Sequence, residues 1–165
     1  MAAFMGVDLG TSSIKVLIVD EEGKVLAQSA RSYRYSSPVN GYAEQDPEEW
    51  WEAFCQASRE AVGSLEIPAK EVNAVGFSGQ MHGLTVLDRN KKAVRPVILH
   101  CDARSKKQAD ELNEKIGTQR ILRETMNPYC VGVALTSLMW LKEKEPENYE
   151  RIRYVMLPKD YLKFR

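Results

Sequence analysis

The stretch Asp8-Leu9-Gly10-Thr11-Ser12-Ser13-Ile14-Lys15 decides how the fold begins. The apolar residues before it and the β-branched run over residues 14–19 predict two strands. Gly10 and the hydroxyl residues after it predict a tight turn between these strands. A second turn signal at Glu22-Gly23 precedes a third strand, predicted over residues 24–35. Three successive strands joined by short turns indicate an antiparallel meander.

Helices and strands alternate after the meander. A helix is predicted from the N-cap Asp46, with Pro47 and Glu49 in its first turn, to a stop at Pro68. A compact apolar strand over residues 72–77 follows, and a strand after a helix typically joins a sheet in parallel. We therefore expect an α/β fold. Later patterns predict strands over residues 84–87, 97–99 and 154–157 and helices over residues 105–116, 118–124 and 134–145. For the first of these helices, Ser105 and Gln108 fit a capping box and Gly117 fits a C′ residue.

Composition narrows the class of protein. The chain has 165 residues, which suits one domain, and its 23 basic and 23 acidic side chains give a formal net charge of zero. A nucleic-acid partner or a membrane surface would require a basic face, so we expect neither. No apolar run is long enough for a transmembrane helix, and the first residues lack a secretory signal. Three cysteines without metal-binding spacing are typical of reduced thiols, which predicts a cytoplasmic location.

Residues 8–15 carry side chains that suit phosphate binding, although the chain has no GxxxxGK[ST] loop. Gly10 permits a turn whose amides point outward, and the hydroxyls of Thr11 and Ser12 add donors. Lys15 can reach a phosphate, and Asp8 can hold Mg²⁺ through water. A plain hairpin accounts for the same residues, so both interpretations stay open at this point.

Two further polar motifs each follow a predicted strand, where α/β proteins gather ligand contacts. In Gly79-Gln80-Met81-His82-Gly83, the side chains of Gln80 and His82 suit the hydroxyl groups of a substrate. A turn with a solvent-facing histidine is the alternative. In residues 100–104, Asp102 either accepts bonds from a polyol or pairs with Arg104 at the start of a helix.

Taken in order along the chain, these motifs resemble the N-terminal domain of the FGGY family of carbohydrate kinases. The resemblance covers essentially all 165 residues and is greatest to the branch that phosphorylates D-xylulose. The segments that carry it are DLGTSSIK (8–15), EQDPEEWW (44–51), GFSGQMHG (76–83), CDARS (101–105) and LPKDYLKFR (157–165).

The resemblance implies a ribonuclease H-like, actin-like ATPase fold with one domain over residues 1–165. Its mixed, five-stranded sheet would begin with the meander and carry helices on both faces. The activity implied is transfer of the γ-phosphoryl group of ATP to the C5 hydroxyl of D-xylulose, with ATP and Mg²⁺ as cofactors. A C-terminal domain absent from this chain would complete the site, and a homodimer is one form of assembly in the family.

The resemblance also implies roles for single residues. The family's catalytic base is an aspartate beyond residue 165, so we expect no catalytic residue in this chain, which should fold yet transfer no phosphate. Met81 and His82 are expected to face a cleft on the same side as Asp8. The implied contacts are Asp8 for the metal, Thr11, Ser12 and Lys15 for the phosphates, and Met81, His82 and Asp102, together with Gln80, for the sugar.

Two positions depart from the family pattern. His100 stands where the family usually has tryptophan, which removes apolar contact area near the expected sugar site. Ser137 stands where lysine is usual. Two alternatives therefore accompany the main interpretation. One is a non-catalytic module of the same fold that binds a sugar or a nucleotide, and the other is an FGGY kinase for another ketose or polyol.

Overall fold

The computed structural model describes residues 2–165 and divides them into two compact units. The first unit contains the chain up to Tyr35 together with Pro47–Gln80 and Lys159–Arg165. The second contains Ser36–Asp46 and Met81–Pro158. The chain thus passes between the units directly after Gln80, in the middle of the predicted ligand-binding motif.

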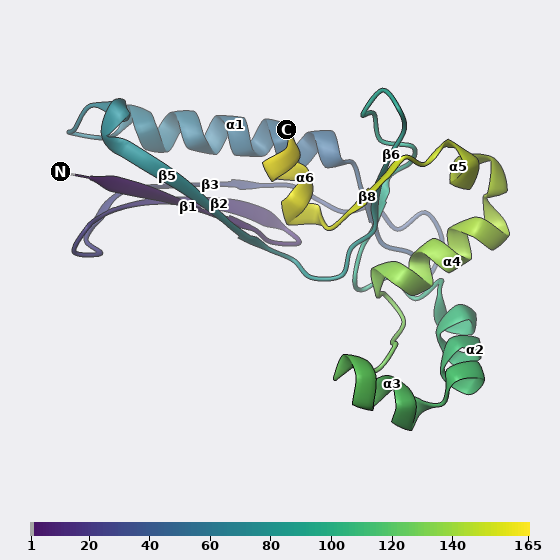
Figure 1. Cartoon of the computed structure of the whole chain (residues 1–165). Helices are drawn as coiled ribbons and strands as arrows, with labels where there is room; N and C mark the ends of the chain where they lie inside the picture. Colours follow the sequence, from purple (N-terminus) through teal and green to yellow (C-terminus); the bar gives the residue numbers. More distant parts are fainter. Residues whose placement is uncertain (1) are drawn as a thin grey trace. The chain divides into compact units, whose positions relative to one another are not determined.

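A four-stranded sheet is the centre of the first unit, with the strand order β3-β2-β1-β5 (Figure 1). Neighbours β1, β2 and β3 pair antiparallel, whereas β5 lies parallel to β1, as the preceding helix predicted. Five strands were expected in this sheet. The later short strands instead pair with one another in the second unit, because the chain leaves the sheet after β5. The four strands are β1 (Ala3–Leu9), β2 (Ser13–Asp20), β3 (Val25–Ser32) and β5 (Val72–Gly79).

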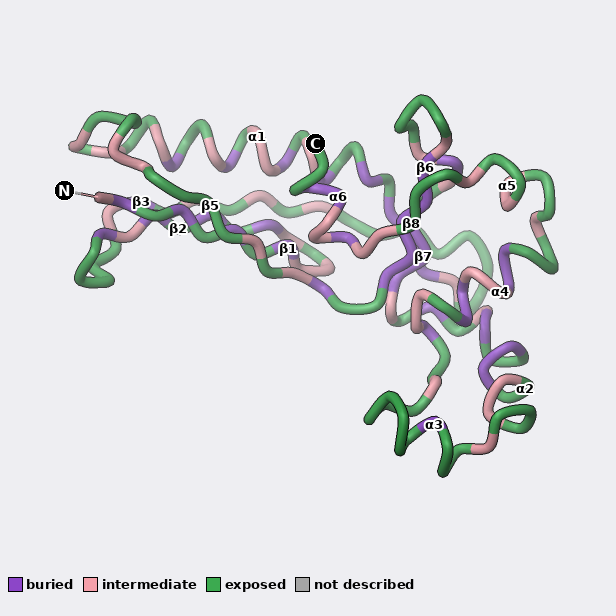
Figure 2. Tube along the Cα trace, viewed as in Figure 1, coloured by how far each residue is buried: buried purple, intermediate pink, exposed green. Residues whose placement is uncertain are grey.

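Helix α1 (Pro47–Gly63) covers one face of this sheet. Side chains alternate between the two faces of a strand, and every second residue of β1 is buried. The Phe54 ring of α1 lies 5.7 Å from the ring of Phe77, which pairs with Val7 on this face. Buried residues recur along one side of α1 (Figure 2), as an amphipathic helix requires. Helix α6 (Pro158–Phe164) joins α1 through a 2.6 Å hydrogen bond from the Tyr161 hydroxyl to Glu48.

The opposite face of the sheet carries no helix within the described residues of this unit, which corrects the expectation of helices on both faces. It forms a hollow of about 990 Å³ lined by residues such as Gly6, Leu17, Ala30 and Gly76. Leu17 is 38% exposed there. The reason lies in the chain's path, because the helices between residues 106 and 151 belong to the second unit.

The second unit combines two short antiparallel strand pairs with four helices. Its hydrophobic core contains Leu84, Val86, Ile98, Trp140 and Leu141. The strand pairs are β4 (Glu44–Gln45) with β7 (Val97–Ile98) and β6 (Thr85–Leu87) with β8 (Tyr154–Met156), and the helices are α2 (Lys106–Ile116), α3 (Thr118–Thr125), α4 (Ala134–Lys144) and α5 (Pro146–Arg151). The 3-10 turn Ala69–Glu71 belongs to the first unit.

The start of α2 corrects a detail of the sequence analysis. Ser105 is the N-cap, but its side chain makes no capping hydrogen bond. Its hydroxyl lies 3.0 Å from that of Thr136, and Gln108 donates to Glu143 rather than back to the cap. Tertiary partners have thus replaced the local capping box. Gly117 ends α2 with a positive φ of 88°, as predicted. None of the helices described between residues 2 and 165 has the length and apolar character that a membrane crossing requires.

Candidate functional site

The predicted turn joins β1 to β2 in the first unit, and backbone hydrogen bonds hold it tightly. The Gly10 amide donates to the Ser13 carbonyl over 2.9 Å. A Cβ atom at Gly10 would lie 3.0 Å from that same carbonyl oxygen, so a glycine suits this position. Tyr33, just after β3, donates its amide to the Ser12 carbonyl over 3.0 Å and its hydroxyl to the Gly10 carbonyl over 2.6 Å. The structure therefore forms the turn that the sequence predicted.

A carboxylate and an ammonium group lie beside this turn. Asp8 and Lys15 are cross-strand partners in the β1–β2 register, and both are exposed. Ser78 pairs with Asp8 from the parallel neighbour β5. All three residues line the hollow on the uncovered face of the sheet. Opposite charges and a hydroxyl thus gather at the end of three adjacent strands, next to the turn, as an anionic ligand with a bound cation requires.

Gln80, for which a sugar contact is predicted, lies beside the turn in the first unit. Its amide donates to the Leu9 carbonyl over 2.7 Å, and its side-chain oxygen accepts a hydrogen bond from the Thr11 hydroxyl over 3.5 Å. Gln80 is 9% exposed. Glycine at 79 permits this close approach, because a Cβ atom there would lie 2.9 Å from the Leu9 carbonyl oxygen. Residues 79–80 therefore brace the end of β1.

Met81 and His82 lie in the second unit, where they line a cavity of about 460 Å³. His82 has a φ of 59°, which is uncommon for a residue other than glycine. The Gly83 amide donates to the Met81 carbonyl over 2.7 Å, so His82 is the centre of a tight three-residue turn. Strained backbone of this kind concentrates at functional sites. That Met81 and His82 face the same cleft as Asp8 stays a prediction, because these residues belong to different units.

The cavity is also lined by His100 and by the segment 127–133, to which the sequence motifs assigned no role. Gly132 packs so closely on His100 that a Cβ atom there would lie 2.0 Å from the His100 carbonyl oxygen. The Nδ1 atom of His100 is buried and has no hydrogen-bond partner among the described residues. The Asn127-Pro128 pair and Gly132 were the signals of an ordered loop, but nothing local linked them to His100.

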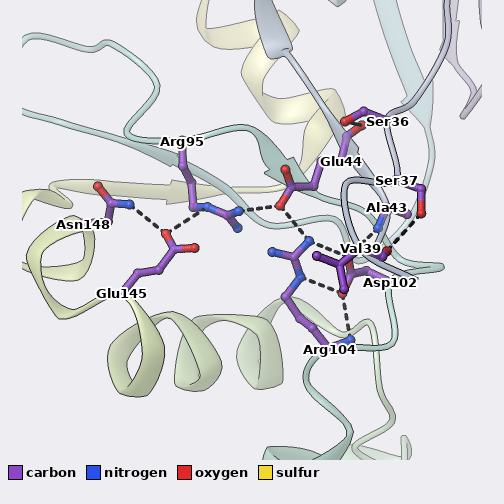
Figure 3. A network of polar contacts seen from close by, with 10 residues as sticks. All are labelled: Ser36, Ser37, Val39, Ala43, Glu44, Arg95, Asp102, Arg104, Glu145 and Asn148. Carbon is purple, nitrogen blue, oxygen red and sulfur yellow. Dashed lines mark hydrogen bonds and ion pairs between the residues drawn. The ribbon is translucent and has the colours of Figure 1, made fainter. Parts of the chain in front are cut away.

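Asp102 belongs to a buried ionic network (Figure 3). It is 1% exposed and accepts hydrogen bonds from the Ala43 amide over 2.6 Å and from Nε and Nη2 of Arg104 over 2.8 Å each. Arg104 also pairs with Glu44 over 2.7 Å. Of the two interpretations left open above, the structure contains the ion pair with Arg104. Asp102 is not among the residues that line the cavity.

The network extends to two further elements of the second unit. Arg95 pairs with Glu44 and, over 3.2 Å, with Glu145 at the end of α4. The Arg104 guanidinium lies 3.8 Å from the centre of the Tyr42 ring and 4.9 Å from that of Trp140. Burial lowers the pKa of Arg104, but its hydrogen bonds to Asp102 and Glu44 outweigh burial and raise the pKa, so Arg104 stays charged. The network therefore ties the segment around His100 to the segment 42–44.

No cluster of three or more histidine, cysteine, aspartate or glutamate side chains suitable for a metal ion exists among residues 2–165. Ser137, the second departure from the family pattern, is buried in α4, and its hydroxyl has no partner within the described part of the chain. Nothing in the structure explains that substitution.

The comparisons with known sequences and known structures point to one family. Residues 3–165 match the sequence model of the FGGY family of carbohydrate kinases, N-terminal domain, which spans both units. The xylulose kinase of Bacillus subtilis is 38% identical over 165 residues, which is 100% of this chain and 33% of that protein. The chain therefore spans about one third of the length of this curated relative.

Solved structures agree. The ligand-bound xylulose kinase from Lactobacillus acidophilus matches with a TM-score of 0.91 and 25% identity, over 100% of this chain and 33% of that one. The xylulose kinase from Bifidobacterium adolescentis matches with a TM-score of 0.86 and 30% identity, over 99% and 34% of the two chains. The chain belongs to the FGGY family of carbohydrate kinases, and it matches the N-terminal domain of that family.

Proposed function

We propose that this chain is the N-terminal, substrate-binding part of an ATP-dependent kinase that phosphorylates D-xylulose at its C5 hydroxyl. The observation that carries the proposal is the braced turn over residues 10–13 beside Asp8 and Lys15, in a chain 38% identical to a xylulose kinase. Because the chain spans about one third of that relative, the activity is proposed for the complete protein. A cytoplasmic location and a homodimer belong to the same proposal.

The phosphates of ATP would meet the turn side of the first unit. In this proposal Thr11 and Ser12 donate hydroxyl hydrogen bonds to phosphate oxygens, and Lys15 offsets their negative charge. Phosphoryl transfer depends mainly on positioning and on stabilisation of charge, which is what these groups supply. The rigid hydrogen bonding of the turn supports this role, because pre-organised donors need no rearrangement during the reaction.

The donor set near the turn fits Mg²⁺ in its usual mode of binding. Asp8 offers a single exposed carboxylate, and no cluster of three ligands exists among the described residues. Mg²⁺ typically keeps several waters and takes one or two carboxylates together with substrate phosphates. When bound, the ion would neutralise charge on the transferring phosphoryl group. Asp8 would hold it, and Lys15 would limit the negative charge left on this side of the site.

The sugar would occupy the cavity of the second unit. Met81 offers an apolar contact, and the His82 imidazole offers hydrogen bonds to hydroxyl groups. We assign Asp102 an indirect role in sugar binding, because protein donors already occupy its carboxylate. The aspartate that would take the proton from the sugar hydroxyl is proposed to lie beyond residue 165. The 165-residue chain alone should therefore bind without transferring phosphate.

A coupled assay of ADP release tests this function. The complete gene product is assayed with MgATP and D-xylulose, and then with a panel of other ketoses and polyols. We expect D-xylulose to give the highest kcat/KM, and the isolated 165-residue chain to give no sugar-dependent turnover. A better substrate elsewhere in the panel would reassign the sugar. Absence of turnover with every sugar would favour a non-catalytic binding module.

A further inference from the structure

Tyr33 lies outside the predicted motifs but contacts the turn directly. It follows β3 directly and makes two hydrogen bonds to the turn, one from its amide to the Ser12 carbonyl and one from its hydroxyl to the Gly10 carbonyl. The second, at 2.6 Å, joins a side chain to a backbone group 23 positions away. Tyr33 thus hydrogen-bonds to the backbone carbonyls on both sides of Thr11.

The consequence for the turn follows from peptide geometry. A trans peptide is planar, so its carbonyl and its N–H point in opposite directions. The bond to the Gly10 carbonyl therefore fixes the direction of the Thr11 N–H, and the bond to the Ser12 carbonyl fixes that of the Ser13 N–H. These two amides belong to the segment proposed to face phosphate. Tyr33 consequently controls the direction of the donors without needing to touch a ligand.

Contacts from a second strand complete the support. Gln80 donates to the Leu9 carbonyl and accepts from the Thr11 hydroxyl, so the turn is held from β5 as well as from the end of β3. Gly10 closes the turn internally onto Ser13. The Tyr33 hydroxyl adds a direct restraint on the Gly10–Thr11 peptide, because it donates to the carbonyl of that peptide. The hydroxyl therefore supplies the only side-chain bond to the Gly10 carbonyl within the described residues.

The hydroxyl remains a donor at any pH at which a kinase works. Burial raises the pKa of Tyr33 above the usual value of tyrosine, and the negative charge of Asp8 raises it further. The phenol consequently keeps its proton. A phenolate would repel both the Gly10 carbonyl and the Asp8 carboxylate, so the arrangement holds only with the neutral side chain.

We propose that Tyr33 is a positioning residue for phosphoryl transfer, acting through the Gly10–Ser13 turn to orient the amides that meet the phosphates of ATP. The proposal rests on the function proposed above. It assigns Tyr33 to the nucleotide side of the reaction and gives it no part in binding the sugar.

The test compares Tyr33→Phe with Tyr35→Phe in the complete gene product. Phenylalanine keeps the ring of Tyr33 and removes only the hydroxyl. Tyr35 is a matched control because it lies two residues on, is 53% exposed and makes no hydrogen bond with the described residues. Two experiments are made. The ADP-release assay gives kcat and both KM values, and hydrogen exchange gives the rates of amides 10–13 in protein without nucleotide.

We expect Tyr33→Phe to lower kcat/KM for MgATP by about three- to tenfold, the range that one lost hydrogen bond produces, and to leave the KM for sugar unchanged. Exchange at amides 10–13 should accelerate by a similar factor, while Tyr35→Phe should match the wild type in both measurements. Equal behaviour of the two variants would overturn the proposal. So would an equal rise in both KM values with a lower unfolding temperature, which indicates a general structural role. If the wild type releases no ADP with any sugar, the proposed function is wrong. The exchange measurement then still tests the role of Tyr33, because unchanged exchange in Tyr33→Phe would refute the claim that its hydroxyl holds the turn.

Discussion

Backbone hydrogen bonds and the side chains of Tyr33 and Gln80 hold the turn over residues 10–13 in the first unit. In the second unit, a buried ionic network and one glycine hold the segments around the cavity beside His82. Every brace of the turn comes from the main chain or from a side chain next to a strand end. The cavity depends on Asp102, Arg104 and Glu44, which come from segments about 60 residues apart. The proposed phosphate site is thus held by hydrogen bonds at the ends of strands, whereas the segments around the proposed sugar cavity are held by buried ion pairs. The two regions should respond differently to mutation.

Arg104→Ala should give the largest loss of stability. It would leave Asp102 and Glu44 buried without their shared cation, and breaking a buried ion pair in this way costs about 3–5 kcal/mol. Thermal and denaturant unfolding measure the loss. Arg120→Ala is the control, because its pair with Glu124 is 64% and 52% exposed and should contribute at most about 1 kcal/mol. Equal losses in the two variants would mean that the network does not hold the second unit.

Gly132→Ala should distort the cavity through a steric clash. The added Cβ atom would lie 2.0 Å from the His100 carbonyl oxygen, and φ at this position is +83°. Strain and overpacking together should cost about 2–5 kcal/mol and raise the KM for sugar. Gly117→Ala separates the two causes, since φ there is +88° but nothing lies within 4 Å of the added atom. This variant should lose only about 1–2 kcal/mol of stability, from backbone strain, and its KM for sugar should not change. A Gly132 variant that behaves like the Gly117 variant would refute the packing of the 127–133 segment on His100.

Glu143 should give the smallest effect, and one that depends on pH. Hydrogen bonds from Lys144, then Lys107 and Gln108, lower the pKa of this exposed carboxyl to about 2. A lowered pKa stabilises the folded state above the ordinary value of 4.5, and this contribution disappears as the pH falls through about 2. Glu143→Gln should therefore remove a small part of the acid sensitivity of unfolding between those values. Glu147→Gln, a change at an exposed glutamate of α5, should leave it unaltered. Identical pH profiles for the wild type and Glu143→Gln would contradict the assignment.

The sequence predicted the turn and its strands because the information is local. Gly10, the hydroxyl residues and the β-branched run stand next to one another, and the structure places Asp8 opposite Lys15 in register. Strand β5 was also recognisable as an apolar run after a capped helix, and it joins β1 in parallel. Such features depend on neighbours in sequence, which pattern analysis reads directly.

The rest could not be predicted because it depends on distant contacts. The Ser105 hydroxyl bonds to Thr136 instead of its own helix, and the Gln80 side chain accepts a hydrogen bond from Thr11, which lies 69 residues away. The packing of the Gly132 loop on His100 joins segments about 30 residues apart, which no local pattern indicates. The predicted number of strands in the sheet was wrong for the same reason, because the sequence of a short apolar strand does not show which strand it pairs with.

The central claim is that the two regions serve different substrates, and calorimetric titration of D-xylulose into two variants of the complete gene product tests it directly. Asp8→Asn removes the negative charge of the proposed metal ligand, while His82→Gly removes the side chain and keeps the positive φ. We predict that Asp8→Asn binds D-xylulose within about twofold of the wild type but loses a hundredfold or more in kcat, roughly 3 kcal/mol of barrier. His82→Gly should bind the sugar about tenfold more weakly, as the loss of a hydrogen bond of roughly 1.4 kcal/mol predicts. Loss of sugar affinity in Asp8→Asn with normal affinity in His82→Gly would contradict the account.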